Sequence, residues 1–151
     1  MFPGNALVQG TGGNKYQLNT LVKKRDLQRK YRVLTYNCEK NEKEFKSIDN
    51  FTSSENDKSL LTILIKSDNK TLKVICTADQ KFWVKEKKIY IPAKELLENY
   101  TVYLFDTEIS STVREGKIFK VVKTPKRESI LYGIAVEENH NYFINGVLTH
   151  D

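Results

Sequence analysis

His140 and His150 are the only two histidines in the chain, and both lie close to its C-terminal end. An imidazole can give or accept a proton near neutral pH, and general acid–base catalysis by such a group typically contributes ~10²–10⁴ in rate. A single histidine is more often structural than catalytic, but here two share one short stretch, and His150 is followed directly by Asp151. We therefore predict a reaction site at this end of the chain.

The thiols are the other nucleophilic candidates, and there are two, Cys38 and Cys76. They do not make a disulfide framework, so both are expected to be free thiols in a reducing, cytoplasmic environment. No Cys-x-x-Cys or His-x-His spacing indicates a metal site. Cys76 precedes Thr77 and could serve as a nucleophile, although a small buried hydrophobic residue is the favoured interpretation.

The net charge of +6 comes mostly from lysine. Such a charge is compatible with nucleic-acid binding, but the lysines are scattered, often beside glutamates, and arginine, the preferred residue for reading bases and phosphates, is scarce. We therefore do not expect nucleic-acid binding. No apolar run approaches the roughly 18–20 residues of a membrane span. Residues 1–5 also lack the basic region and apolar core of a signal peptide.

The last strands of the chain must position the histidines. Residues 142–144 and 147–149 are apolar or β-branched, and Asn145-Gly146 between them is a strong hairpin signal, because both residues accept the positive φ of a type I′ turn. A chain end is usually frayed unless something ties it down. Such a hairpin would pair the final strand within a sheet and hold His150 and Asp151 in place.

Short strands dominate the rest of the chain, which predicts an all-β fold. They are expected at residues 16–22, 33–36, 60–67, 71–76, 82–84, 89–91, 100–105, 118–122 and 131–136. One short helix of about two turns is expected at residues 92–99, where Pro92 suits a first turn. Residues 40–59 are the most polar part of the chain. Phe45, Ile48 and Phe51 could pack one side of a strand or loop, and the remainder is expected to form a solvated insertion. A length of 151 residues is enough for one domain and not comfortably for two.

The C-terminal motifs closely resemble those of inteins and the wider Hint family. His-Asn followed by aromatic residues occurs at residues 140–143, and an Asn-Gly turn followed by apolar residues and a histidine occurs at residues 145–150. The family pattern ends in His-Asn, whereas this chain ends in His150-Asp151.

Three upstream regions resemble family motifs in the same order. Residues 1–8 keep Phe2 and Gly4 of the family's first strand but carry Met1 where a Cys or Ser is usual. The Thr-x-x-His motif is matched by Thr77 and, in the histidine's place, Gln80. Residues 91–97 resemble the family's x-Ala-x-x-Leu segment. A further departure is Gly133, where many members carry Asp.

The resemblance implies a Hint fold, a horseshoe-like β domain whose two ends meet at one site. Residues 1–151 would form a single intein-like domain, without the endonuclease that some inteins carry, because only residues 106–116 are free between the middle and C-terminal motifs. The chain is most similar to mini-inteins or the bacterial-intein-like group. Some members of that group lie between ubiquitin units in ciliate polyubiquitin genes, so a ubiquitin-like flank is one candidate.

The resemblance also implies autocatalytic processing of the polypeptides that flank the domain in cis, by a monomer and without cofactor or metal. The first-residue nucleophile would lie at Met1, and Thr77 and Gln80 would hold the first scissile amide. His150 would polarise the C-terminal scissile carbonyl, His140 would assist, and Asp151 stands where the family's Asn cyclises. A methionine thioether has no proton to lose and cannot attack, so we expect the N-terminal step to be blocked, with Met1 replacing a cysteine.

Two other classes remain open. One is a non-catalytic, basic, β-rich module that binds an acidic protein or RNA. The other is a hedgehog-like Hint autoprocessor, which would give no reason for the C-terminal His-Asp. A binding module has no need to bring Met1 and Asp151 together, so the distance between the chain ends separates it from a self-processing domain.

Overall fold

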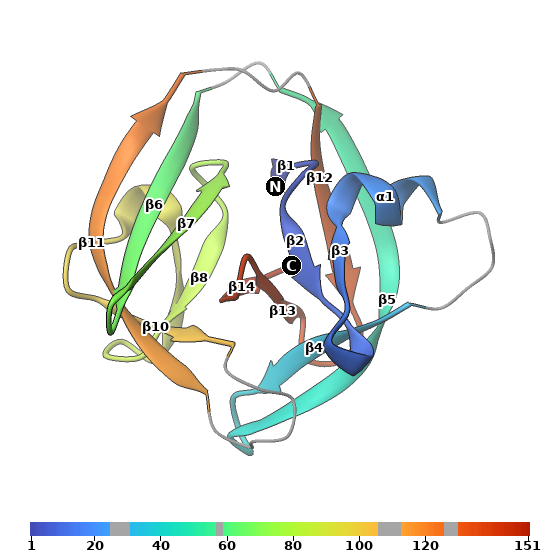
Figure 1. Ribbon diagram of the computed structural model, residues 1–151, viewed down its shortest axis with the longest axis horizontal. Helices are drawn as coiled ribbons and strands as arrows, with labels where there is room; N and C mark the ends of the chain where they lie inside the picture. The colour runs from blue at the N-terminus through green and yellow to red at the C-terminus, as the bar shows by residue number, and fades with distance from the viewer. Residues whose placement is uncertain (25–30, 57–58, 106–112, 126–129) are drawn as a thin grey trace.

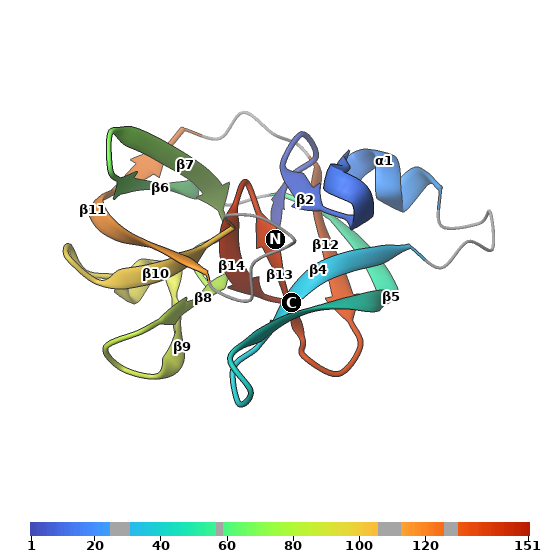
Figure 2. The same ribbon diagram turned by 60° about the horizontal axis from the view of Figure 1, so that its bottom comes forward.

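A computed structural model of the chain describes residues 1–24, 31–56, 59–105, 113–125 and 130–151. Strands make up most of this part of the chain, which confirms the expected all-β class. The longer strands curl around a short C-terminal hairpin, and both chain ends lie near the middle of the molecule (Figures 1 and 2).

Within the described residues, fourteen strands form two sheets. In chain order they are β1 (Phe2–Pro3), β2 (Leu7–Gln9), β3 (Lys15–Gln17), β4 (Arg32–Asn37), β5 (Glu42–Glu55), β6 (Leu60–Ser67), β7 (Lys70–Cys76), β8 (Lys81–Val84), β9 (Ile89–Pro92), β10 (Thr101–Leu104), β11 (Arg114–Thr124), β12 (Ile130–Val136), β13 (Asn141–Ile144) and β14 (Val147–His150). The smaller sheet has the order β1-β12-β5-β4 and the larger one the order β3-β2-β13-β14-β10-β11-β6-β7, with β8 pairing β14 and β9 pairing β8.

The C-terminal hairpin forms as expected. Asn145 and Gly146 have φ values of 47° and 84°, so both turn residues adopt the left-handed conformation that the turn requires. All four residues of β13 are buried, as are the first three residues of β14. This burial ties down the chain end, because the apolar side chains on both faces of the hairpin would be exposed if it frayed.

Residues 40–59 are not a solvated insertion. Most of this segment is β5, the longest strand, whose first half pairs with β4 and whose second half pairs with β12. Ile48 is the one buried residue of this strand, so composition gave only the weak strand signal of Phe45, Ile48 and Phe51. The strand persists because its backbone groups are paired along both halves, and these pairings override local polarity.

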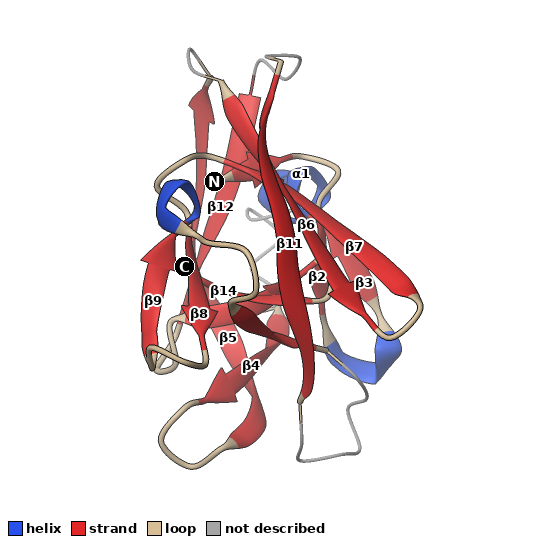
Figure 3. Cartoon of the chain, turned by 90° about the vertical axis from the view of Figure 1, so that its left-hand side faces the viewer, coloured by secondary structure: helices blue, strands red, loops and turns tan. Residues whose placement is uncertain are grey.

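One short α-helix was expected and the described residues hold one, but its expected position was wrong. Residues 92–99 hold a single 3₁₀ turn, Ala93–Glu95, after which Leu96 is extended. Leu97 is 59% exposed, so a second helical turn would bury little apolar surface. The α-helix α1 lies instead at Leu18–Lys23, within a segment expected to be a strand, and it buries Leu18, Leu21 and Val22 at helical spacing. Figure 3 shows how little of the molecule is helical.

One expectation falls partly outside the described residues, namely the free segment at residues 106–116. No helix in the described ranges is long and apolar enough to cross a membrane.

Candidate functional site

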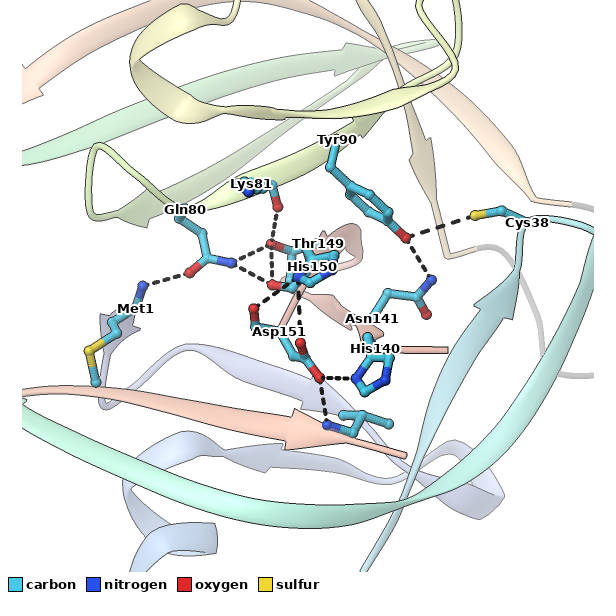
Figure 4. Close-up of polar contacts among 11 residues, drawn as sticks. Met1, Cys38, Gln80, Lys81, Tyr90, His140, Asn141, Thr149, His150 and Asp151 are labelled. Carbon is cyan, nitrogen blue, oxygen red and sulfur yellow. Dashed lines mark hydrogen bonds and ion pairs between the residues drawn. The ribbon is translucent and has the colours of Figure 1, made fainter. Parts of the chain in front are cut away.

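The two ends of the chain meet across the side chain of Gln80. The amino group of Met1 donates to Gln80 Oε1 at 2.6 Å and to Thr77 Oγ1 at 2.9 Å. On its other side, Gln80 Nε2 donates to the main-chain carbonyl oxygen of His150 at 2.6 Å. One amide group therefore contacts both the first and the penultimate residue (Figure 4).

The turn between β7 and β8 places this amide. Gln80 N–H donates to Thr77 O at 3.2 Å and closes the turn. Thr77 N–H donates to Met1 O at 3.0 Å and fixes the turn to the first residue. The strand that follows the turn, β8, pairs with β14 through Phe82 and Thr149. The Gln80 side chain thus lies between two fixed main-chain segments.

The neighbours of Gln80 dictate the orientation of its amide. The ammonium group of Met1 can only donate, so it requires the Oε1 acceptor. Thr149 Oγ1 donates to Lys81 O at 2.8 Å and accepts from Gln80 Nε2 at 2.9 Å. The amide thus uses one acceptor and two donors, a set that a neutral imidazole cannot supply, because it has one donor and one acceptor.

The N-terminal side of the site is largely desolvated. Burial lowers the pKa of the Met1 amino group, and the nearby negative charge of Asp79 partly offsets this effect. Cys76, next to Thr77, is fully buried, and burial raises the pKa of its thiol to about 12. It is therefore a protonated thiol at neutral pH, in agreement with the favoured interpretation of a small buried hydrophobic residue.

At the C-terminal side, the last residue is held by β12 and by His140. Asp151 Oδ2 accepts from Val136 N–H at 2.8 Å and lies 3.2 Å from His140 Nδ1. Asp151 N–H donates to His140 O at 2.9 Å. His150 Nδ1 lies 3.0 Å from the main-chain oxygen of Asp151, where a ring N–H would polarise that carbonyl.

A hollow of about 400 Å³ opens between the two ends. Its lining residues include Met1, Gln80, Gly133, His150 and Asp151. A Cβ on Gly133 would lie 3.8 Å from Met1 Cγ, so the position at which many family members carry Asp does face the first residue. Within the described ranges, no cluster of three or more His, Cys, Asp or Glu residues could hold a metal ion.

Comparison with known proteins identifies the architecture. No protein-family model matches the sequence, and no curated protein matches it. Among solved structures, the chain is similar to an intein from a hyperthermophile, with a TM-score of 0.85 and 16% identity over 99% of this chain and 98% of that one. This chain has the intein fold.

Other inteins agree with this likeness over almost their whole length. A DnaB intein from Synechocystis sp. PCC 6803 has a TM-score of 0.78 and 15% identity over 99% of this chain and 96% of that one. A DnaX mini intein from Spirulina platensis has a TM-score of 0.73 and 19% identity over 99% of this chain and 98% of that one. The expected Hint fold is therefore confirmed.

Within the intein fold, every site residue expected from the sequence lies near a chain end. Met1, Thr77 and Gln80 contact one another, and His140, His150 and Asp151 form a second group joined to the first by the Gln80–His150 hydrogen bond.

Sequence reasoning missed the contacts around Tyr90. Its ring packs edge-on against the His150 ring with 4.8 Å between centroids, and its hydroxyl accepts from Asn141 Nδ2 at 2.9 Å. The Asn141 side chain also exchanges two hydrogen bonds with the main chain of Tyr36. Tyr90 lies directly before the family-like segment at residues 91–97 but belongs to none of its pattern positions, so it had no signal. The position of Asn141 directly after His140 could have suggested it.

Proposed function

We propose that this domain cleaves or splices the polypeptides that flank it in cis, acting once on its own backbone. The observation that carries the proposal is the Gln80 bridge, which joins Met1 N to His150 O through two contacts of 2.6 Å each. A binding module gives no reason for the two ends to share one buried amide. The likeness to inteins over 99% of the chain supports treating residues 1–151 as one such domain without an endonuclease.

At the N-terminal junction, Thr77 and Gln80 would hold the scissile amide. In a precursor the nitrogen of residue 1 carries one N–H, so it can donate to Thr77 Oγ1 or to Gln80 Oε1 but not to both. A cysteine at position 1 would attack the preceding carbonyl, forming a C–S bond and breaking the C–N bond, and the released amine would then donate to both groups. Met1 has no such nucleophile, so we propose that the chain as written is inactive at this step.

At the C-terminal junction, the Asp151 carboxylate would attack its own main-chain carbonyl, forming a C–O bond and breaking the C–N bond to the following residue, and water would then open the ring. His150 would polarise that carbonyl and protonate the leaving nitrogen, a general acid role. His140 would assist by fixing the last residue. The flanking segments are the substrates, and a ubiquitin-like flank and a monomeric state both stay predictions.

Fusion precursors test the proposal. A Met1→Cys chain carrying an N-terminal flank is expected to release that flank when a small thiol is added, and intact-mass spectrometry would show the product. Met1→Ala in the same precursor is the matched control, since it folds around the same position without a nucleophile. A folded Met1→Cys precursor that stays uncleaved with thiol would overturn the proposal.

A further inference from the structure

Tyr90 is held at its hydroxyl end by two residues from distant parts of the chain. The hydroxyl oxygen accepts from Asn141 Nδ2 at 2.9 Å and lies 3.8 Å from Cys38 Sγ, a contact in which either group can donate (Figure 4). Asn141 is itself anchored, because its side chain exchanges two hydrogen bonds, of 2.9 Å and 2.8 Å, with the main chain of Tyr36. Burial raises the pKa of the Tyr90 phenol, so the hydroxyl stays neutral and keeps these contacts.

The ring of Tyr90 is also held, between Trp83 and His150. Its centroid lies 5.1 Å from that of the Trp83 ring and 4.8 Å from that of the His150 ring, and both pairs are close to edge-on. Trp83 and Tyr90 are direct partners in the pairing of β8 with β9, so the strand register sets their contact. Ring pairs in this geometry attract one another beyond the area that they bury. The Tyr90 ring is therefore a fixed surface for the imidazole of His150.

The orientation of the His150 ring matters because its two nitrogens are not equivalent. Nδ1 lies 3.0 Å from the main-chain oxygen of Asp151 and 3.5 Å from Oδ1 of the same residue. Both neighbours are acceptors, so Nδ1 carries the proton when the ring is neutral. The His150 side chain is 36% exposed, and a partly exposed imidazole turns about its Cβ–Cγ bond unless a neighbour holds it.

We propose that Tyr90 is a positioning residue for C-terminal cleavage, and that its ring holds the His150 imidazole with Nδ1–H directed at the carbonyl of residue 151. This inference rests on the proposed self-processing function. Tyr90 acts through His150, while Cys38 and Asn141 fix its far end. A positioned general acid contributes ~10²–10⁴ in rate, and part of that contribution depends on orientation. Tyr90 should therefore affect the C-terminal junction, whereas Gln80 contacts both chain ends.

Variants of one precursor test this role. The precursor has flanks on both sides and carries Met1→Cys and Asp151→Asn, so that intact-mass spectrometry follows both junctions. Tyr90→Leu removes the ring and is expected to slow C-terminal release by at least about tenfold. Tyr90→Phe keeps the ring and is expected to stay within about threefold of the parent rate. Tyr100→Leu is the matched control, because Tyr100 is also half-buried but packs against the main core.

The N-terminal junction separates positioning from a loss of folding. A folding defect of the kind that Tyr100→Leu can cause would slow both junctions alike. Tyr90→Leu is instead expected to leave thiol-induced release of the N-terminal flank at the parent rate, since its contact with the site is through His150. Equal slowing at both junctions would overturn the positioning role, as would an unchanged C-terminal rate.

Nitrogen NMR tests the orientation without any cleavage. The chain has only two histidines, so substitution of one assigns the other, and the ¹⁵N shifts report which ring nitrogen carries the proton. In mildly alkaline buffer His150 is expected to hold its proton on Nδ1 in the parent chain and in Tyr90→Phe. Tyr90→Leu is expected to give a mixture of the two neutral forms, while His140, which contacts Asp151, serves as the internal reference.

Two results separate this inference from the function on which it rests. A folded parent precursor that cleaves at neither junction would overturn the proposed function. A parent that cleaves, together with a Tyr90→Leu chain that matches it in C-terminal rate and in the His150 nitrogen shifts, would overturn the role of Tyr90 alone.

Discussion

Replacing Gln80 with leucine should cost the folded protein substantial stability. The change removes a hydrogen bond to a charged group, Met1 N, and two to neutral acceptors, Thr149 Oγ1 and His150 O. A bond to a charged group contributes about 1.5–3 kcal/mol and a neutral one about 0.5–1.5 kcal/mol. The sum is an upper bound, because the amino group keeps its bond to Thr77 and the three contacts share one side chain. We expect the free energy of unfolding to fall by about 2–4 kcal/mol.

Urea unfolding measures this loss. With a slope of about 1–3 kcal/mol per molar urea, the midpoint of Gln80→Leu is expected to fall by about 1–2 M while the slope stays the same. Gln17→Leu is the matched control, because Gln17 is exposed on β3 and should change the stability by no more than about 0.5 kcal/mol. If Gln80→Leu unfolded at the same midpoint as the control, the bridge would contribute nothing, and the reasoning would be refuted.

Three further predictions follow from the site and its supports. In a precursor with a downstream segment, His150→Ala should slow release of that segment by at least about tenfold, because the group that polarises the scissile carbonyl is lost. Mass spectrometry of the products measures the rate, and a rate equal to that of the parent chain would make His150 a structural residue. Gly146→Ala should lower the free energy of unfolding, measured in urea, by about 1 kcal/mol. The φ angle at this position is 84° and no atom lies within 4 Å of the new methyl group, so the loss would come from backbone strain and not from a clash. An unchanged free energy of unfolding would contradict the turn geometry. Burial lowers the pKa of the Met1 amino group below its ordinary value of 8.0, so at a pH between these two values the unfolded chain binds more protons there than the folded chain. The free energy of unfolding should therefore rise with pH across this window and level off above 8.0. A glycine added before Met1 removes this buried amine and should flatten that part of the profile.

Some parts of the fold could be predicted because one or two residues determine the local backbone conformation. Asn145-Gly146 predicts its hairpin, since few other residue pairs adopt two positive φ values in succession. The full length of strand β5 could not be predicted, because only one of its residues, Ile48, is buried and its stability comes from pairing with β4 and β12. Helix α1 was missed for a related reason, as its three buried residues fit a short strand as well as a helix.

In the candidate site, too, some residues could be predicted from the sequence and some contacts could not. Thr77, His140 and His150 were expected because they lie in segments that resemble the intein motifs. The partner of Asp151 on β12 is the main-chain N–H of Val136, which any residue except proline would offer, so no side-chain signal exists for it. The role of Gln80 at both ends also had no sequence signal, because the second contact depends on β8 pairing with β14.

We propose that the Gln80 amide acts at both the N-terminal and the C-terminal junction. The most direct test of this claim is a precursor with flanks on both sides that carries Met1→Cys and Asp151→Asn, followed by intact-mass spectrometry with and without Gln80→Leu. The folded fraction of each variant is checked by circular dichroism under the same conditions. We predict that Gln80→Leu slows cleavage at both junctions. Slowing at one junction, with the other cleaving at its original rate, would contradict the account.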